Sequence, residues 1–263
     1  MLYFHQAIQW SHKKAFVFEG DIDDAWMQGR AAFGGLGVGA ALHVLKAQCS
    51  DHERILSLNA SFLAPLRTGK ASLKLQMLRK GKNIAFWQAK ITQEQAPLIT
   101  MLVTIGQDRQ TSIPSTKAQK PNIAPFEELI ALPFIPGLTP NFTQHFDYRW
   151  EKNNMPFSGN QKAAISGWIR PKGNPKITES EIAGMMDAWP PPILMCAKKP
   201  SPASTIQWQL QFKSTPAQSN WWEFHSKSRS SGNGLSHDHH EIWDEHGNLI
   251  ALSQQLTAEF SSR

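Results

Sequence analysis

The segment Phe33–Gln48 reads FGGLGVGAALHVLKAQ, and it decides which fold the surrounding sequence can adopt. Its residues are mostly small and apolar, and the apolar ones occupy nearly every side of a helix. A helix without a polar face is buried on most sides. The segment therefore predicts a helix enclosed by other elements, and its glycines allow an enclosing sheet to approach closely.

Strand-like segments lie on both sides of this helix in the sequence. Before it, the even spacing of Phe16, Phe18 and Ile22 predicts a half-buried strand. After it come four strand-like runs: Ile55–Leu63, Ala71–Leu78, Ile84–Ile91 and Leu98–Ile105. A buried helix followed by an antiparallel meander predicts a sheet that wraps around its own helix.

The second half repeats this order of elements. A strand at Ala163–Ile169 precedes a helix at Thr178–Ala188, which Thr178 or Ser180 can cap and which the prolines at 190–192 end. Four more strand-like runs follow: Thr205–Phe212, Trp221–Ser226, Leu235–Trp243 and Leu249–Phe260.

Equivalent positions in the two halves recur at a nearly constant offset. Phe62 and Phe212 are 150 residues apart, and Leu98 and Leu249 are 151 apart. The sequence therefore predicts an α+β protein of two fused, similar units, since its helices and strands do not alternate. We expect the units at 1–106 and 142–263, with a proline-rich linker at 107–141.

Length and composition exclude several classes of protein. The chain has 263 residues and two cysteines, which is too few for a disulfide scaffold or a cysteine-built zinc site. The net charge of +6 is scattered, without the interleaved basic and aromatic residues of a nucleic-acid binder. No segment has the length and apolar composition of a membrane span, and none has the pattern of a secretory signal peptide. We expect a soluble cytoplasmic protein.

Three motifs have a functional and a structural interpretation. Gly35–Ala40 fits a dinucleotide-binding pattern, but no buried strand precedes it, and close packing explains its glycines better. His237–His240 alternates along a predicted strand, so at most two of its side chains converge, and a solvated edge or hairpin strand is preferred to a metal site. Asp187, flanked by apolar residues, either faces water or has a buried partner.

Taken together, these segments resemble the acyl-CoA thioesterase II (TesB-like) family of double hot-dog proteins. In the first half, the segments that carry the resemblance are Ala32–Leu42, Asn59–Leu63 and Arg79–Asn83. In the second half, they are Met186–Pro190, Ser204–Ile206 and Gly247–Ala251 with Gln255. The implied fold is two antiparallel sheets, each wrapped around a long central helix.

The resemblance implies a reaction and its residues. Members of the family hydrolyse an acyl-CoA thioester to a free acid and coenzyme A, a reaction that belongs to fatty acid metabolism. By position, Asp187, Thr205 and Gln255 would order the attacking water, and Gly34 and Gly35 would stabilise the oxyanion. No metal or other cofactor is implied, and the positive charge suits the phosphates of coenzyme A. Exposed sheet edges favour a homo-oligomer.

Two other functions remain open at this point. A double hot-dog dehydratase or hydratase would need a catalytic histidine in an H-x-x-x-G-x-x-x-x-P setting, which this sequence lacks. A non-catalytic acyl-CoA-binding protein would keep the fold without the chemistry. The offset places Ile55 opposite Thr205, Thr104 opposite Gln255 and Gly37 near Asp187. We therefore expect one working site per chain.

Overall fold

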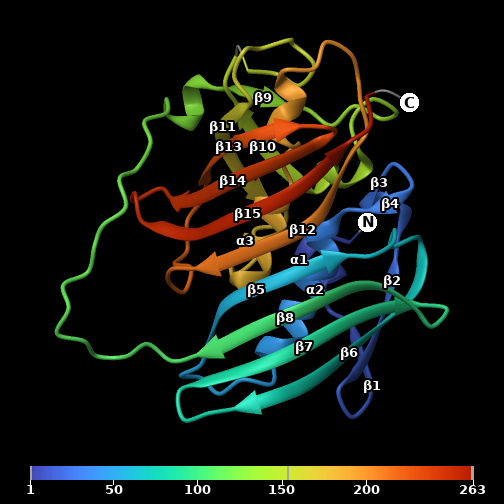
Figure 1. Ribbon diagram of the computed structural model, residues 1–263, viewed down its shortest axis with the longest axis vertical. Coiled ribbons are helices and arrows are strands. Elements are labelled where there is room, and N and C mark those ends of the chain that lie inside the picture. Colours follow the sequence, from blue (N-terminus) through green and yellow to red (C-terminus); the bar gives the residue numbers. More distant parts are fainter. Residues whose placement is uncertain (1, 153, 262–263) are drawn as a thin grey trace.

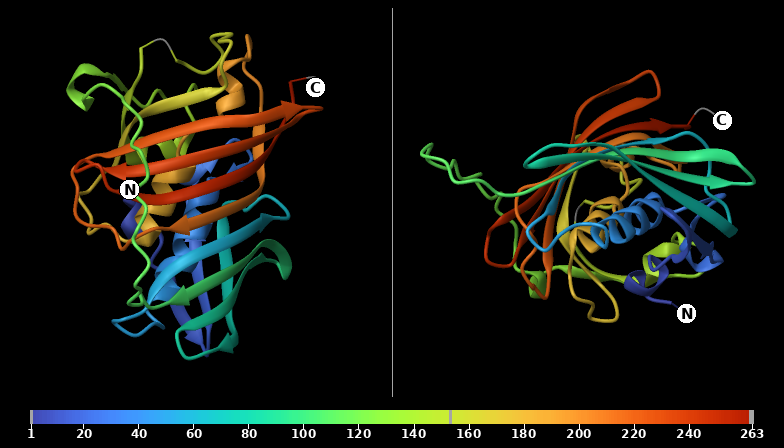
Figure 2. Two further views of the ribbon diagram at one scale, coloured as in Figure 1. Left: turned by 60° about the vertical axis from the view of Figure 1, so that its left-hand side comes forward. Right: turned by 90° about the horizontal axis from the view of Figure 1, so that it is seen from below.

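The glycine-rich segment forms the enclosed helix that its sequence predicts. The computed structural model describes residues 2–152 and 154–261. Helix α2 (Gly34–Lys46) has 13 residues, of which ten are buried. It lies on the concave side of a curved sheet, beside helix α3 (Glu179–Asp187), which has only 9 residues (Figures 1 and 2). With its caps Thr178 and Ala188 this helix spans the predicted range, but it is shorter than the long central helix that the resemblance implies.

Most strands belong to one sheet of 13 strands that runs through both halves. The first half supplies β1 (Ser11–Lys14), β2 (Val17–Ile22), β5 (Arg54–Phe62), β6 (Gly69–Lys80), β7 (Ile84–Gln93) and β8 (Ala96–Gly106). The remainder supplies β9 (Ile130–Leu132), β10 (Phe146–Trp150), β11 (Ala164–Pro171), β12 (Ala203–Phe212), β13 (Trp222–Gly232), β14 (Leu235–Asp244) and β15 (Leu249–Glu259). The short strands β3 (Met27–Gln28) and β4 (Ala31–Ala32) pair separately.

The order of the strands confirms the predicted repeat. The order β2-β6-β7-β8-β5 of the first half is followed by β12-β15-β14-β13-β11, which is the same order reversed. The two halves meet where β5 pairs antiparallel with β12, with Asn59 opposite Gln209 (Figure 1). Backbone hydrogen bonds therefore continue from one half into the other.

Irregularities in the pairing fix the offset between the halves residue by residue. The register of β5 and β8 shifts between Ile55 and Ser57, and that of β12 and β15 shifts between Thr205 and Gln207. Each shift is the signature of a β-bulge, an extra residue that redirects nearby side chains. Ile55 and Thr205 therefore occupy equivalent places, as predicted.

The predicted equivalence of Thr104 and Gln255 is wrong by one residue. Gln255 pairs with Trp208, and the corresponding pair in the first half is Val103 with Leu58. A slip of one residue moves a side chain to the other face of a sheet. The buried counterpart of Gln255 is thus Val103.

Several further elements differ from the prediction or were absent from it. Strand β9, within the predicted linker, pairs with β10, so that part of the linker extends the sheet. Strand β14, which carries the histidine cluster, lies between β13 and β15 and is not an edge strand. The 3₁₀ helices are η1 (Asp24–Trp26), η2 (Phe126–Glu128), η3 (Asn141–His145) and η4 (Pro192–Met195). No helix among the described residues is long and apolar enough to cross a membrane.

The short helix α1 (Phe4–Ala7) places a side chain between the two central helices. The Phe4 ring is fully buried and lies against Gly39 of α2 and Gly184 of α3. A Cβ at Gly39 would lie 2.7 Å from this ring, and one at Gly184 would lie 2.5 Å from it. The two glycines thus provide the space in which Phe4 packs.

Truncation of this ring tests the packing. We expect Phe4→Ala to lower the free energy of unfolding by about 3–5 kcal/mol, because a large side chain leaves a cavity between two helices. Denaturant unfolding curves measure the change. The exposed neighbour Leu2 provides the control, with Leu2→Ala expected to change little. Equal stabilities for the two variants would contradict the packing.

Candidate active site

A directed chain of hydrogen bonds joins the three residues predicted to order a water molecule. Thr205 Oγ1 donates to Gln255 Oε1 at 3.0 Å. Gln255 Nε2 donates in turn to Asp187 Oδ1 at 3.0 Å. The residues come from β12, β15 and the last position of α3. Although they are distant in sequence, the fold brings them into one network.

Asp187 is held in place because both ends of its helix are fixed. At the start, Thr178 and Glu181 form a capping box, which satisfies amides that have no partner within the helix. At the end, the carbonyl of Ala188 accepts a hydrogen bond from the buried Tyr148 hydroxyl at 3.0 Å. Trp189 follows and stacks on Phe224. The chain therefore leaves the helix immediately after Asp187.

The second oxygen of Asp187 belongs to the other half of the chain. The Gly35 amide, in the first turn of α2, donates to Asp187 Oδ2 at 2.7 Å. Amides in this position have no acceptor within their helix, and the helix dipole there favours a negative charge. Gly35 was expected to be an oxyanion donor, but in this structure its amide positions the carboxylate.

Gly34 is the other residue expected at the oxyanion, and its role here is steric. A Cβ at this position would lie 2.9 Å from Asp187 Oδ2 and 3.0 Å from the Phe62 ring. The carboxylate can therefore approach the helix only because Gly34 has no side chain. Gly34 is the first residue of α2, so its backbone N–H has no acceptor within the helix.

Burial changes the acidity of Asp187. Removal from water raises the pKa of this carboxyl to about 7, and this effect outweighs the hydrogen bonds from Gln255 and Gly35, which lower the pKa. A carboxyl with a pKa near neutrality can both take up and release a proton at the operating pH. Each of its oxygens also keeps a lone pair for a further donor such as water.

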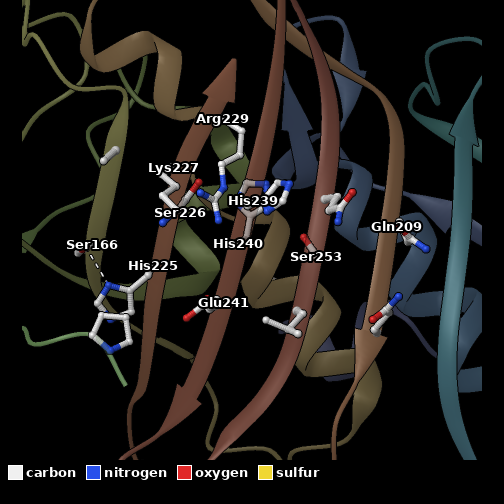
Figure 3. A pocket seen from close by; sticks show the side chains of 15 residues that line it. Ser166, Gln209, His225, Ser226, Lys227, Arg229, His239, His240, Glu241 and Ser253 are labelled. Carbon is white, nitrogen blue, oxygen red and sulfur yellow. Dashed lines mark hydrogen bonds between the residues drawn. The ribbon is translucent and has the colours of Figure 1, made fainter. Parts of the chain in front are cut away.

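A second polar network lies on the outer face of the sheet and was not predicted (Figure 3). Ser166 Oγ lies 3.0 Å from His225 Nδ1, and His225 Nε2 lies 2.5 Å from Glu223 Oε1. Lys120 of the predicted linker pairs with the other Glu223 oxygen at 2.6 Å. No local motif signals this network, since Ser166 and His225 are 59 residues apart. It attaches the connecting segment to the sheet.

The histidine cluster alternates across β14 as predicted. His237 is exposed and His239 is half-buried, whereas Asp238 and His240 are buried on the inner face. Among residues 2–152 and 154–261, no group of three or more His, Cys, Asp or Glu side chains is placed to hold a metal ion.

Comparison with solved structures identifies the fold. A hot-dog-fold protein of unknown function from Alicyclobacillus acidocaldarius superimposes with a TM-score of 0.87 at 18% identity, covering 99% of this chain and 98% of that one. A candidate thioesterase II from Thermobifida fusca gives 0.84 at 18% identity, covering 98% and 97%. The acyl-CoA thioesterase II TesB2 from Mycobacterium marinum gives 0.77 at 16% identity, covering 98% of each chain.

Comparison with models of protein families shows the family of the chain. A search of curated proteins finds no match to the chain. The family model described as the acyl-CoA thioesterase N-terminal domain matches residues 22–106, and the one described as the C-terminal domain matches residues 126–258. These two matches show that the chain belongs to the acyl-CoA thioesterase family.

Proposed function

We propose that this protein hydrolyses an acyl-CoA thioester to a free acid and coenzyme A, with Asp187 as the general base. The observation that carries the proposal is the hydrogen-bond chain from Thr205 through Gln255 to Asp187, which the Gly35 amide completes. The hydrogen bonds of the chain are donated in the direction of Asp187, so the position of its carboxylate is fixed before substrate binds. Such preorganisation lowers the barrier to attack by an oriented water molecule.

The proposed reaction has two stages. Asp187 takes a proton from a water molecule as its oxygen attacks the thioester carbonyl, which produces a tetrahedral oxyanion. The amide at Gly34, at the positive end of α2, is our candidate donor to this oxyanion. Collapse of the intermediate breaks the C–S bond, and the departing sulfur receives the proton held by Asp187. The fatty acid and coenzyme A then leave.

We further propose that each chain has one such site. Helix α2 contains no aspartate or glutamate that could act as Asp187 does. The positions equivalent to Thr205 and Gln255 are held by Ile55 and Val103, which are both buried and apolar. The first half contributes Gly34 and Gly35 to the site of the second half.

Removal of the general base is the direct test. We expect Asp187→Asn to lower kcat by about 10²–10⁴-fold, because the amide cannot accept the proton. The measurement is release of free thiol from short-, medium- and long-chain acyl-CoAs. Asp147→Asn, which removes a half-buried carboxylate that pairs with Arg170, is the control and should retain full activity. If wild type binds these thioesters but releases no thiol, the protein is a non-catalytic acyl-CoA binder.

The pH dependence of the reaction follows from the burial of Asp187. Since the pKa of this carboxyl is about 7 and only its ionised form accepts a proton, kcat/KM should rise through pH 7 to a plateau. Gln255→Met removes a hydrogen bond that lowers this pKa, so the midpoint should move to higher pH and the plateau should fall. An unmoved midpoint in Gln255→Met would argue against Asp187 as the titrating base.

The contact between Gly34 and Asp187 provides a third test. Gly34→Ala should lower kcat by about tenfold or more, because the new methyl group displaces the carboxylate. Gly232→Ala is the matched control, since a Cβ there meets nothing within 4 Å. Turnover assays at saturating substrate measure kcat for the two variants. Equal kcat values would show that the carboxylate tolerates displacement.

A further inference from the structure

The inner faces of the two halves differ in polarity. In the first half, Leu75, Ala89 and Met101 form a cross-strand row on β6, β7 and β8, and all three are buried and apolar. The repeat places Ser226, His240 and Ser253 of β13, β14 and β15 in the same row of the second half. Equivalent positions on the inner face are therefore apolar in the first half and polar in the second.

The polar row is buried without internal hydrogen bonds. Ser226, His240 and Ser253 lie directly opposite one another on three neighbouring strands, and each is at most 5% exposed (Figure 3). The two hydroxyl oxygens and both ring nitrogens of His240 have no hydrogen-bond partner. Buried polar groups in native proteins are nearly always paired. These four neighbouring atoms therefore have hydrogen-bonding capacity that no described residue uses.

This row adjoins the proposed active site. The next row along the same strands pairs Asp238 with Gln255, the residue that donates to Asp187. Ser253 and Gln255 are two residues apart on β15 and face the same side, which is about 7 Å along the strand. A molecule whose thioester lies at Asp187 could therefore reach the row with its acyl chain.

The chemistry of the row selects a neutral oxygen. Burial lowers the pKa of His240 to about 3, so its ring is uncharged and offers one donor and one acceptor. Burial also raises the pKa of the adjacent Asp238, which favours its neutral form. A carboxylate placed here would have no counter-charge, whereas a hydroxyl or carbonyl oxygen can pair with the serine hydroxyls and the imidazole.

On the basis of the function proposed above, we propose that Ser226, His240 and Ser253 form a subsite for a hydroxyl or carbonyl oxygen borne on the acyl chain, away from the thioester. The preferred substrate is then an oxygenated acyl-CoA. A site built to hydrogen-bond a substrate oxygen discriminates against the analogue that lacks it, since the protein groups are then left unpaired.

The test compares one straight-chain acyl-CoA with its monohydroxylated derivatives, in which the hydroxyl moves carbon by carbon from the thioester to the far end. We expect one or more derivatives to show kcat/KM about two- to tenfold above the parent, the effect of one or two hydrogen bonds. Ser253→Ala and His240→Phe should each bring this ratio close to one. The control is Gln254→Ala on the outer face of the same strand, which should leave the ratio unchanged.

The outcomes separate this inference from the proposed function. If the parent is hydrolysed as well as every derivative, or if the preference survives in both variants, the subsite is wrong and the thioesterase function stands. If wild type releases no thiol from any substrate, the proposed function is wrong. Calorimetric binding of the hydroxylated and plain free acids then decides the subsite, because only tighter binding of a hydroxylated acid that Ser253→Ala abolishes would support it.

Discussion

One hydrogen bond, from the Gly35 amide to the Asp187 carboxylate, joins the chemistry of one half of the chain to the helix of the other. It can form only where the start of α2 and the end of α3 lie side by side. The pairing of β5 with β12, the packing of Phe4 between the helices and the absence of a side chain at Gly34 all serve this approach. The contacts that bring the two halves together therefore also shape the candidate site.

The two halves share one architecture and differ in the polarity of their inner faces. Strand order and bulge positions match across the β5–β12 junction. The inner face of the first half is hydrocarbon, whereas that of the second holds Gln255 and the row through His240. Buried polar groups without partners cost free energy, and the apolar inner face of the first half does not carry this cost.

Sequence patterns predicted the elements whose signal is periodic and long. Helix α2 could be predicted because its residues are apolar all round, and the repeat because the elements recur in the same order at a nearly constant offset. The Thr104 equivalence failed since the hairpins before β8 and β15 differ in length, which a constant offset cannot represent. Helix α1 has four residues and no period at all.

The candidate site was predictable to a different extent. The resemblance was enough to name Asp187, Thr205 and Gln255. It could not predict which of these side chains donates a hydrogen bond to which, because that depends on distances between strands. The partner of Gly35 lies 152 residues away, and no local pattern connects the two. Alternation along β14 placed Asp238 and His240 on one face without indicating that this face is buried.

The continuous ladder across β5 and β12 has a mechanical consequence. A hinge between the two halves would have to break backbone hydrogen bonds in the middle of the 13-stranded sheet. A substrate of the proposed reaction would therefore have to enter without separation of the two halves. Separation of β5 from β12 would also part the Gly35 amide from the Asp187 carboxylate, so the candidate site exists only while this ladder is intact.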